Sequence, residues 1–577
     1  MVEIDVEGAA EGYIELFNRK GVDYIFSSPG TEFLPLWEYL AKYNGQGKRP
    51  YYINARHEGT ALSIAKGYAM VTGRPQVVLS HVLVGLLHGA MELRALFIDQ
   101  IPVVLIVGQT WTHDEEIYGG TPGSHYLSFT QVGGQSRVVQ PYVKWSESPV
   151  SNETILETMD RALDIASEGL KGPVLLALSR ELMFEKRTKM NIPHEKPQPT
   201  RIQADTDEIK TLARLLGKAM DPIIFTRYLG RNRGAVSSLV ELAQLLSAPV
   251  FETPGYMNFP TDNPLHIGYD ISPFAPESDL ILVIDSSGWP PWYPPKSILQ
   301  ESEAKIVFMD LNPLQTRYPS YGYPADMLIK ADSGLALPTL TEYLRGRLDG
   351  SSVRLQERSR RWEAEHKRIR DEWEKEALKT EGDIPIDPRW LCFKVNEVIY
   401  GDTITVNETI THGRIIHRYI EKNRRHPGTH FEAAGPVAHT GLGQGLGVAL
   451  GVKLANPDKT VIALEGDGSF NYNPVHACYG LAQEYNLPFL TIILNNQGYA
   501  AMKQHTSYYP GGWSERMDRY YGVYMRPRPE YVKIIEAFGG YGETVEDPAE
   551  LEPSLTRALD ELKENRVALL DVILKPP

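Results

Sequence analysis

The chain has 577 residues, of which 42% are hydrophobic and 23% charged, so a single small binding module and a globally disordered chain are both excluded. Its net charge of −14 disfavours sequence-independent binding to nucleic acid or to an anionic membrane. The two cysteines, Cys392 and Cys478, form no CxxC pair, which argues against a disulfide framework and a cysteine zinc site. An acidic start and the lack of an apolar run of about 18 residues predict a cytoplasmic protein without a membrane span.

Three α/β blocks are expected in chain order. Residues 1–184 alternate helical patterns with short apolar runs such as YIFSSPG and IPVVLIVGQ, which predicts a parallel sheet covered by helices on both faces. Residues 205–345 repeat this pattern with LILVIDSS and KIVFMDLN, and residues 385–577 with TVIALEGDG and LPFLTIILNN. The expected fold class is therefore α/β, with three successive doubly wound parallel-sheet domains.

Two connecting segments separate these blocks. Residues 185–204 are polar and contain several prolines and lysines, so they are expected to form a linker. Residues 346–384 are dense in alternating charges, which is typical of a solvated helix between domains.

The strongest chemical pattern lies in the third block. A buried strand is expected to open into Gly466-Asp467-Gly468, and the next apolar strand ends at an Asn-Asn pair that contains Asn496. Because the carboxyl ends of neighbouring parallel strands meet at one edge of a sheet, Asp467 and Asn496 are expected side by side. With the carbonyl of Gly498 they would supply hard oxygen ligands, which suit Mg²⁺ bound together with a phosphate-bearing ligand. The pattern therefore predicts a diphosphate site.

Gly-Asp-Gly followed after 26 residues by Asn-Asn resembles the thiamine diphosphate (ThDP) binding motif. Over nearly the whole chain, the three blocks resemble the superfamily of acetolactate synthase, pyruvate oxidase and benzoylformate decarboxylase. The resemblance implies ThDP and Mg²⁺ as cofactors, with Asp467, Asn496 and Gly498 as metal ligands. It also implies a wider set of positions in contact with the cofactor: Glu58, Leu442, Gly466, Asp467, Gly468, Ser469, Asn496, Gly498 and Tyr499.

A second segment, NARHEGTALS, resembles the Arg-His-Glu segment of this superfamily and contains Glu58. ThDP becomes a nucleophile when C2 of its thiazolium ring loses a proton. In the family a glutamate bonded to N1′ of the aminopyrimidine favours the tautomer that accepts this proton, and the resemblance gives Glu58 that role. Glu58 follows a predicted strand and begins a helix, so it would be held in the ligand crevice of the sheet. Alternatively, it is a first-turn glutamate that interacts with the helix dipole.

The resemblance also implies a homo-oligomer, a dimer or a tetramer, because in this superfamily the glutamate domain of one subunit faces the diphosphate domain of another. Leu442 matches the apolar residue that wedges between the two cofactor rings. The glycines around it also favour close backbone packing, so Leu442 could simply belong to the core.

Other matched positions would select the reaction. Thr31, in Ser-Pro-Gly-Thr, matches a position near the substrate. His81 aligns with a proton-transferring histidine of benzoylformate decarboxylase, and imidazole suits general acid/base work near neutral pH. His88 lies where many relatives have a different, glycine-turn sequence, so its role is less specified. Tyr499 and Met502 are expected to line the substrate side.

The middle block lacks a Gly-rich dinucleotide fingerprint, so FAD is not supported. The expected function is a ThDP- and Mg²⁺-dependent lyase or ligase acting on a 2-oxo acid. The Arg-His-Glu segment favours acetolactate synthase-like carboligation, whereas His81 favours benzoylformate decarboxylase-like decarboxylation. The alternatives are a 2-hydroxyacyl-CoA or oxalyl-CoA type lyase and a non-catalytic paralogue that retains the fold.

Overall fold

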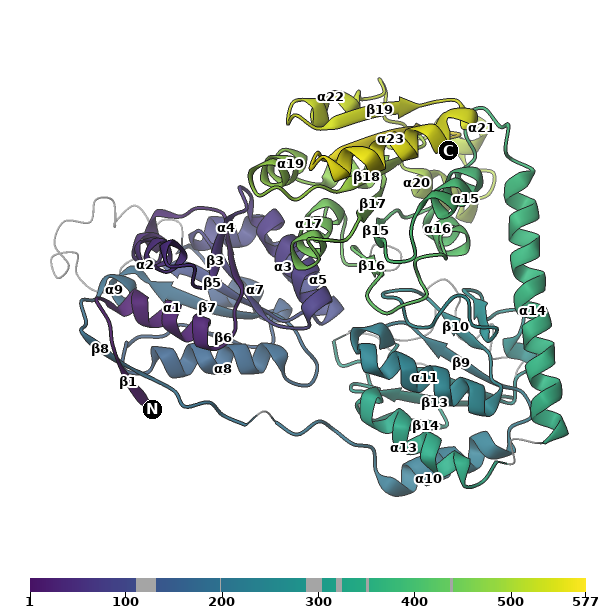
Figure 1. Ribbon diagram of the computed structural model, residues 1–577, viewed down its shortest axis with the longest axis horizontal. Coiled ribbons are helices and arrows are strands. Elements are labelled where there is room, and N and C mark those ends of the chain that lie inside the picture. The colour runs from purple at the N-terminus through teal and green to yellow at the C-terminus, as the bar shows by residue number, and fades with distance from the viewer. Residues whose placement is uncertain are drawn as a thin grey trace. The chain divides into compact units, whose positions relative to one another are not determined.

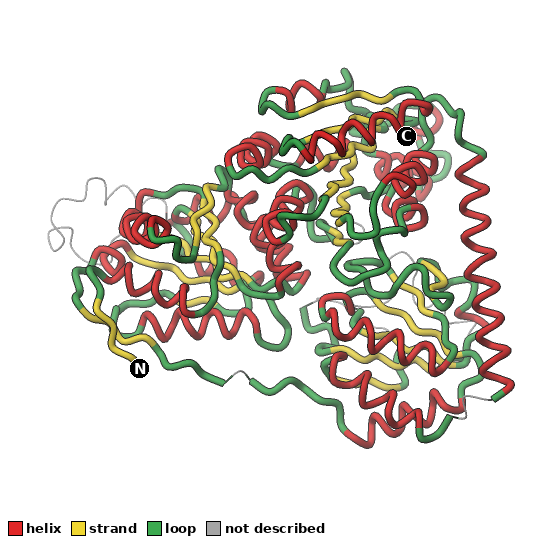
Figure 2. Tube along the Cα trace, in the orientation of Figure 1, coloured by secondary structure: helices red, strands yellow, loops and turns green. Residues whose placement is uncertain are grey.

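A computed structural model describes residues 1–109, 131–197, 199–286, 303–317, 324–348, 352–435 and 439–576. Within these ranges the strands form three six-stranded sheets, each entirely parallel, and one two-stranded antiparallel ribbon (Figures 1 and 2). This confirms the predicted α/β class with successive parallel sheets. No helix among the described residues is both long and apolar enough to cross a bilayer.

The first sheet has the strand order β3-β2-β4-β5-β7-β6. Strands β4 and β5 are buried along almost their whole length, as expected for central parallel strands covered on both faces. The strands of this sheet are β2 (Tyr24–Ser27), β3 (Tyr51–Asn54), β4 (Gln76–Ser80), β5 (Val103–Gln109), β6 (Ser146–Glu147) and β7 (Val174–Ser179). Its helices are α1 (Ala9–Arg19), α2 (Leu34–Gly45), α3 (Glu58–Thr72), α4 (Val82–His88), α5 (Ala90–Asp99), α7 (Gln135–Val139), α8 (Ile155–Ser167) and α9 (Arg180–Phe184).

The ribbon pairs the start of the chain with part of the segment expected to be a linker. Strand β1 (Val2–Asp5) runs antiparallel to β8 (Lys189–Ile192). In β8, Met190 and Ile192 are buried, whereas Lys189 and Asn191 are exposed. This two-residue alternation is the pattern of a half-buried strand, but it is too short to stand out in a polar stretch.

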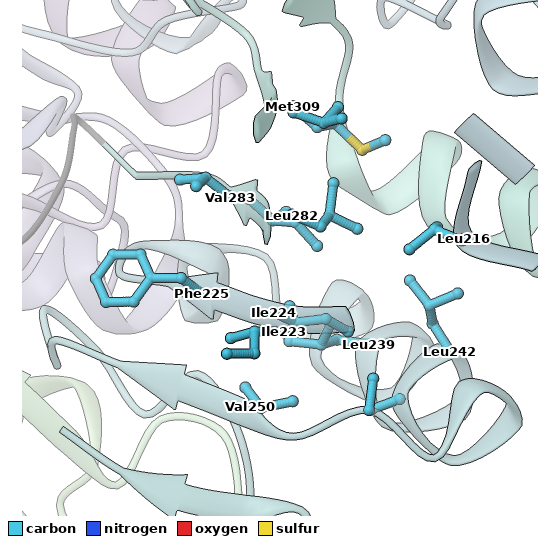
Figure 3. Packing of buried hydrophobic residues seen from close by; sticks show 14 of the residues in the cluster. Leu216, Ile223, Ile224, Phe225, Leu239, Leu242, Val250, Leu282, Val283 and Met309 are labelled. Carbon is cyan, nitrogen blue, oxygen red and sulfur yellow. The ribbon is translucent and has the colours of Figure 1, made fainter. Parts of the chain in front are cut away.

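The middle sheet has the order β11-β10-β9-β12-β13-β14. Figure 3 shows its core, where Ile224, Leu282 and Met309 of the sheet pack near Leu216 and Leu242 of the covering helices. The strands are β9 (Pro222–Thr226), β10 (Val250–Glu252), β11 (His266–Gly268), β12 (Leu280–Ile284), β13 (Lys305–Asp310) and β14 (Met327–Lys330). The helices are α10 (Thr206–Lys218), α11 (Arg233–Leu246) and α13 (Ser333–Arg345).

The charge-rich segment forms the expected helix, α14 (Val353–Leu378). Most of its residues are exposed, but Leu355, Arg358 and Trp362 are buried. Trp362 belongs to the core of the middle sheet, so this helix is anchored to a domain rather than solvated all round.

The third sheet has the order β16-β15-β17-β18-β20-β19. Its strands are β15 (Ile404–Glu408), β16 (His430–Glu432), β17 (Val461–Gly466), β18 (Leu490–Asn495), β19 (Tyr541–Val545) and β20 (Ala568–Ile573). The helices of this part of the chain are α15 (Pro388–Val398), α16 (Gly413–Tyr419), α17 (Gly445–Ala455), α18 (Asp467–Tyr472), α19 (Val475–Glu484), α20 (Ala500–His505), α21 (Trp513–Arg516), α22 (Tyr531–Glu536) and α23 (Leu551–Lys563).

By packing, the chain divides into two units that do not follow chain order. The first comprises residues 1–199, 438–458 and 470–489, and the second comprises residues 200–437, 459–469 and 490–577. Helix α17 therefore packs with the first sheet, although the chain places it between two strands of the third.

Candidate active site

In the second unit, Asp467 and Asn496 lie at the carboxyl ends of two adjacent strands. Asp467 follows β17 directly, and β18 ends one residue before Asn496. The parallel register pairs Gly466 with Leu494, which brings the two ends to the same edge of the sheet. Here the strand order also reverses, between β15 and β17, and open α/β sheets bind ligands at such a point.

The backbone after β18 folds back onto Asp467. The amide of Gly498 lies 2.9 Å from Asp467 Oδ2 and 3.2 Å from Asn496 Oδ1, and the amide of Gly468 donates to Asp467 Oδ1 at 3.0 Å. Gln497 has a φ of 62°, the left-handed conformation that makes this tight turn. Both side-chain oxygens are thus held close to one backbone atom, Gly498 N.

The electrostatics of Asp467 suit a cation. Only 2% of the residue is exposed, and burial raises the pKa of its carboxyl group to about 7 although the backbone N–H donors oppose the shift. A buried carboxylate is costly unless a cation or hydrogen bonds compensate its charge. A divalent ion at this position would supply the missing charge.

The two glycines beside Asp467 differ in how closely they are packed. A Cβ built on Gly466 would be in ordinary van der Waals contact with Ser469 Oγ, at 3.7 Å. A Cβ on Gly468 would come within 2.7 Å of the ring of Tyr499, so Gly468 allows that ring to pack closely. Ser469 is buried in the first turn of α18. These residues fit Mg²⁺ with a diphosphate, because they offer hard oxygen ligands at the carboxyl edge of a parallel sheet.

Gly498 has a carbonyl that already accepts a hydrogen bond from Ala500 N at 3.2 Å. A carbonyl oxygen has two lone pairs, so one remains for a metal ion.

In the first unit, three neighbouring strands carry polar residues at their carboxyl ends. Strand β2 lies between β3 and β4. Glu58 follows β3 after a short turn, Thr31 follows β2, and His81 follows β4 directly. Thr31 is exposed, and His81 and Glu58 are partly buried. The three residues that the sequence singled out here therefore share one edge of one sheet.

Glu58 begins α3, whose N-cap is His57: the ring Nδ1 of His57 accepts from Gly59 N at 3.0 Å. One carboxylate oxygen of Glu58, Oε2, lies 2.7 Å from His88 Nδ1. The rings of His57 and His88 lie 4.1 Å apart, and burial, with His88 nearby, lowers the pKa of His57. His88 thus holds one oxygen of the carboxylate, and the ring of His57 lies beside that of His88.

Gly85 explains why α4 can pack against Glu58. A Cβ at Gly85 would lie 2.8 Å from Ser80 Oγ and 3.1 Å from Glu58 Oε1. The departure from the family's glycine turn, which left the role of this segment open, therefore produces a helix that approaches Glu58 and brings His88 to it.

His81 has a partner that the sequence reasoning missed, Glu32. His81 Nδ1 lies 2.7 Å from Glu32 Oε2, and the amide of Val82 donates to Glu32 Oε1 at 3.1 Å. Glu32 is completely buried, and the hydrogen bond to it raises the pKa of His81 although burial opposes the shift. Val82 has a φ of 31°, uncommon for a β-branched residue, so the backbone is strained where it enters α4.

A signal for Glu32 was present in the sequence. It follows Thr31, a nominated substrate-side residue, at the end of a strand that neighbours the strand before His81. An acid and a histidine at adjacent strand ends are candidates for a pair, but only the spatial order of the strands shows that they are adjacent.

Leu442 lies half-buried in a turn between Gly441 and Gly443, whose φ values are 110° and 96°. Only glycine adopts such angles readily, so this turn depends on both. Directly after it, Gln444 Oε1 accepts from the buried Lys66 Nζ of α3 at 3.0 Å, and the same ammonium group contacts Asp99 Oδ2 at 2.7 Å. The hydrogen bond between Gln444 and Lys66 therefore connects the turn that contains Leu442 to α3, the helix that begins with Glu58.

Met502, which was expected to line the substrate side, is about half exposed, and the nearby His505 contacts the carbonyl of Ala501 in its own helix through Nδ1, at 2.7 Å. Neither makes a contact that assigns it a chemical role.

An oxygen-ligand pair at the edge of one parallel sheet, and a glutamate and a paired histidine at the edge of another, define an α/β enzyme that uses a phosphate-bearing cofactor. Two family descriptions match the chain: "Thiamine pyrophosphate enzyme, N-terminal TPP binding domain" over residues 8–131, and "Thiamine pyrophosphate enzyme, C-terminal TPP binding domain" over residues 411–572. The chain belongs to the thiamine pyrophosphate enzyme family.

Individual relatives extend the similarity over the whole chain. The acetolactate synthase large subunit of Haemophilus influenzae is 26% identical, over 98% of this chain and 94% of its own length. The benzoylformate decarboxylase of Pseudomonas aeruginosa is 27% identical, over 85% of this chain and 86% of its own length. Among solved structures, the thiamine diphosphate-dependent 4-hydroxybenzoylformate decarboxylase of Rhodococcus jostii RHA1 has the same fold, with a TM-score of 0.77 at 23% identity and 99% coverage of both chains. The protein is thus a ThDP-dependent enzyme related to acetolactate synthase and benzoylformate decarboxylase.

Proposed function

We propose that this enzyme, with ThDP and Mg²⁺, decarboxylates a 2-oxo acid and releases the corresponding aldehyde. The observation that carries the choice of reaction is the pair formed by His81 and the buried Glu32, next in the sheet to the strand that precedes Glu58. A decarboxylase has to return one proton to the carbon that lost CO₂, and a histidine held by a carboxylate is suited to that task.

In this proposal Asp467, Asn496 and the Gly498 carbonyl hold Mg²⁺, which in turn holds the diphosphate. Bound there, ThDP supplies a thiazolium carbon that becomes nucleophilic and stabilises negative charge on the substrate. The carboxyl ends of β17 and β18, where open α/β sheets bind ligands, support a ligand at this edge of the sheet.

Glu58 has the role of holding a proton at the pyrimidine ring nitrogen. His88 occupies Oε2, whereas Oε1 has no hydrogen-bond donor among the described residues. That oxygen is therefore available to the ring nitrogen. His88 acts as a positioning residue, because its contact with Oε2 restricts the orientation of the carboxylate.

His81 has the role of general acid. Glu32 binds Nδ1, which leaves Nε2 for proton exchange with the substrate. The raised pKa keeps more of His81 protonated at neutral pH. Thr31, exposed at the next strand end, is placed to hydrogen-bond the substrate carboxylate before it leaves.

The Asp467 group and the Glu58 group belong to different packing units. We infer a homo-oligomer, a dimer or a tetramer, from the resemblance to a superfamily in which the glutamate domain of one subunit faces the diphosphate domain of another. Carboligation, the capture of the same carbon by a second 2-oxo acid, is the second candidate, because acetolactate synthase relatives cover almost the whole chain.

The test is a screen of 2-oxo acids with aliphatic and aromatic side chains, alone and with aldehyde or 2-oxo acid acceptors, in the presence of ThDP and Mg²⁺. Release of CO₂ with one equivalent of aldehyde supports the proposal, and a coupled hydroxyketone product supports carboligation instead. Glu58→Gln serves as the inactive control. If no acid in the screen loses CO₂ faster with wild-type protein than with this variant, the proposal is wrong.

A further inference from the structure

A second cluster of chemically active side chains lies in the second packing unit and plays no part in the proposed reaction. It consists of His417, His430 and Glu432, all of which are less than a tenth exposed. Glu432 Oε1 lies 2.8 Å from His417 Nε2 and 3.0 Å from His430 Nε2. One ligand atom from each residue lies within 4.8 Å of the other two.

The local structure explains why these three side chains converge. His430 and Glu432 are the first and last residues of β16, and residues two apart in a strand point to the same face. His417 comes from α16, which lies in the chain between β15 and β16 and directs its ring toward that face. Strand β16 is the edge strand of the sheet; it pairs with β15 on one side, and on the other Phe431 forms an isolated antiparallel bridge with Tyr256.

The distances are those of a metal-binding set. A transition metal is bound by imidazole nitrogen and carboxylate oxygen at about 2.0–2.2 Å. Two such bonds at angles between about 90° and 110° place their ligand atoms about 2.9–3.5 Å apart. Of the two oxygen–nitrogen distances, 3.0 Å lies at the short end of this range and 2.8 Å just below it. Two histidines and one carboxylate are the ligands of catalytic Zn²⁺ sites and of non-haem Fe²⁺ sites.

Neighbouring residues hold the ligands in place as metal sites require. Thr405 Oγ1 lies 2.9 Å from His430 Nδ1, so the ring can be protonated there and can offer its Nε2 lone pair to an ion. Asn407 Nδ2 lies 2.9 Å and 3.0 Å from the two carboxylate oxygens of Glu432. Thr405 and Asn407 are both on β15, so the partner strand fixes both ligands of β16.

The cluster is reached from a cavity. A cavity of about 370 Å³ is lined by His417 and Glu432 together with Tyr269, Trp373 and Arg414. It therefore offers an ion a route of entry and leaves coordination positions that water or a small ligand can fill.

A buried positive charge, Arg424, lies next to the cluster. It donates to the carbonyl of His417 and to the hydroxyl of Tyr269, and its charge interacts with those of Glu252 and Glu421. Glu432 makes its hydrogen bonds with His417, His430 and Asn407 instead.

We propose that His417, His430 and Glu432 bind one divalent transition-metal ion per chain, of the Zn²⁺ class, with its remaining coordination positions open to the cavity. This ion is distinct from the Mg²⁺ proposed at Asp467, and its binding does not depend on the proposed reaction. Soft or borderline metals prefer imidazole, whereas Mg²⁺ prefers oxygen ligands, so the two sites would select different ions.

The experiment uses the full-length protein, stripped of metal by a chelator and then saturated with ThDP and Mg²⁺. It is titrated with Co²⁺, whose visible absorption reports imidazole ligation, and then with Zn²⁺. We expect one Co²⁺ per chain, displaced by Zn²⁺. An absence of Co²⁺ binding by the wild-type protein overturns the proposal.

Matched variants locate the site. His417→Gln and Glu432→Gln are expected to weaken Co²⁺ binding by more than the 10–100-fold that changes around a metal ligand produce. Thr405→Val, which removes only a supporting hydroxyl, is expected to weaken it by about 10-fold, and this variant keeps the proposal testable if the others fail to fold. His194→Gln changes an exposed histidine and is expected to bind normally, as is Asp467→Asn. Unchanged affinity in both Glu432→Gln and Thr405→Val, or lost binding in Asp467→Asn, contradicts the assignment.

Discussion

The first and third sheets have the same strand order, position for position, but they carry different functional side chains at their strand ends. The order β3-β2-β4-β5-β7-β6 of the first sheet corresponds to β16-β15-β17-β18-β20-β19 of the third, and the middle sheet differs from both. At its carboxyl edge the first sheet presents Glu58 and His81, for which we propose proton exchange, whereas the third presents Asp467 and Asn496, which we propose as metal ligands. The fold thus supplies the place for a ligand, and the side chains at the strand ends decide what is done there.

The correspondence extends to a pair of helices. Helix α3 links β3 to β4, and helix α17 links the equivalent strands β16 and β17. These two helices pack against each other through glycines. A Cβ on Gly67 would lie 2.1 Å from the carbonyl oxygen of Val448, and a Cβ on Gly451 2.1 Å from that of Ile64. Corresponding helices therefore approach each other backbone to backbone.

The largest effect on cofactor binding is expected from a substitution at the edge of the third sheet that carries Asp467 and Asn496. Asp467→Asn keeps the shape but removes the charge that holds the cation, and the loss of one partner of a buried charge costs about 3–5 kcal/mol. ThDP with Mg²⁺, at about 100 times Kd, stabilises a folded protein by about 2.7 kcal/mol. Thermal melting should show this stabilisation in the wild type and in Asp458→Asn, an exposed control, but not in Asp467→Asn. Equal cofactor-induced shifts in all three proteins would remove Asp467 from the site.

At the carboxyl edge of the first sheet, Glu58→Gln should leave cofactor binding nearly intact. It should lower turnover by about 10²–10⁴-fold, the usual contribution of general acid/base catalysis. The amide cannot hold the proton at the pyrimidine nitrogen as the acid does. Hydrogen–deuterium exchange at C2 of bound ThDP measures the step directly. Exchange at the wild-type rate would assign Glu58 to a structural role at the start of α3.

A smaller effect is expected from the partner of His81. Glu32→Gln removes the charge that raises the pKa of His81, so the pKa should fall. If protonated His81 is the acid, turnover declines as the pH rises through this pKa, and in Glu32→Gln the decline should begin at lower pH. We expect about a 10-fold loss near neutral pH, against about 10²-fold for His81→Ala. An unshifted pH profile in Glu32→Gln would mean that His81 is not the titrating acid.

The smallest effect on catalysis is expected from a substitution between helices α3 and α17, which should change stability instead. Gly451→Ala forces a methyl group against the backbone of α3, and overpacking of this kind costs about 1–3 kcal/mol. Gly217→Ala is the matched control, because it lies in a helix with no atom within 4 Å of the added Cβ, and there alanine should be neutral or stabilising. The apparent Tm should fall only for Gly451→Ala. A Tm that stays unchanged would show that the two helices can separate without cost.

Residues at strand ends were the most predictable part of the site. The apolar runs before Asp467 and Asn496 are long enough to be recognised as buried strands. Because neighbouring parallel strands end at the same edge of a sheet, the two residues could be predicted to lie together. The pairing of His81 with Glu32 was not predictable in this way, because it depends on β2 lying between β3 and β4. Similarly, β8 is too short for its alternation to be distinguished from a polar linker.

Local periodicity and spacing were sufficient to predict the α/β class and the residue types at the strand ends, because apolar runs and their flanking residues are read from short segments. The contacts of His88 with Glu58, of His81 with Glu32 and of His417 with Glu432 join residues 30, 49 and 15 positions apart. Contacts over such separations depend on strand order and helix packing, which hydrophobic burial of the whole chain determines and no short segment encodes.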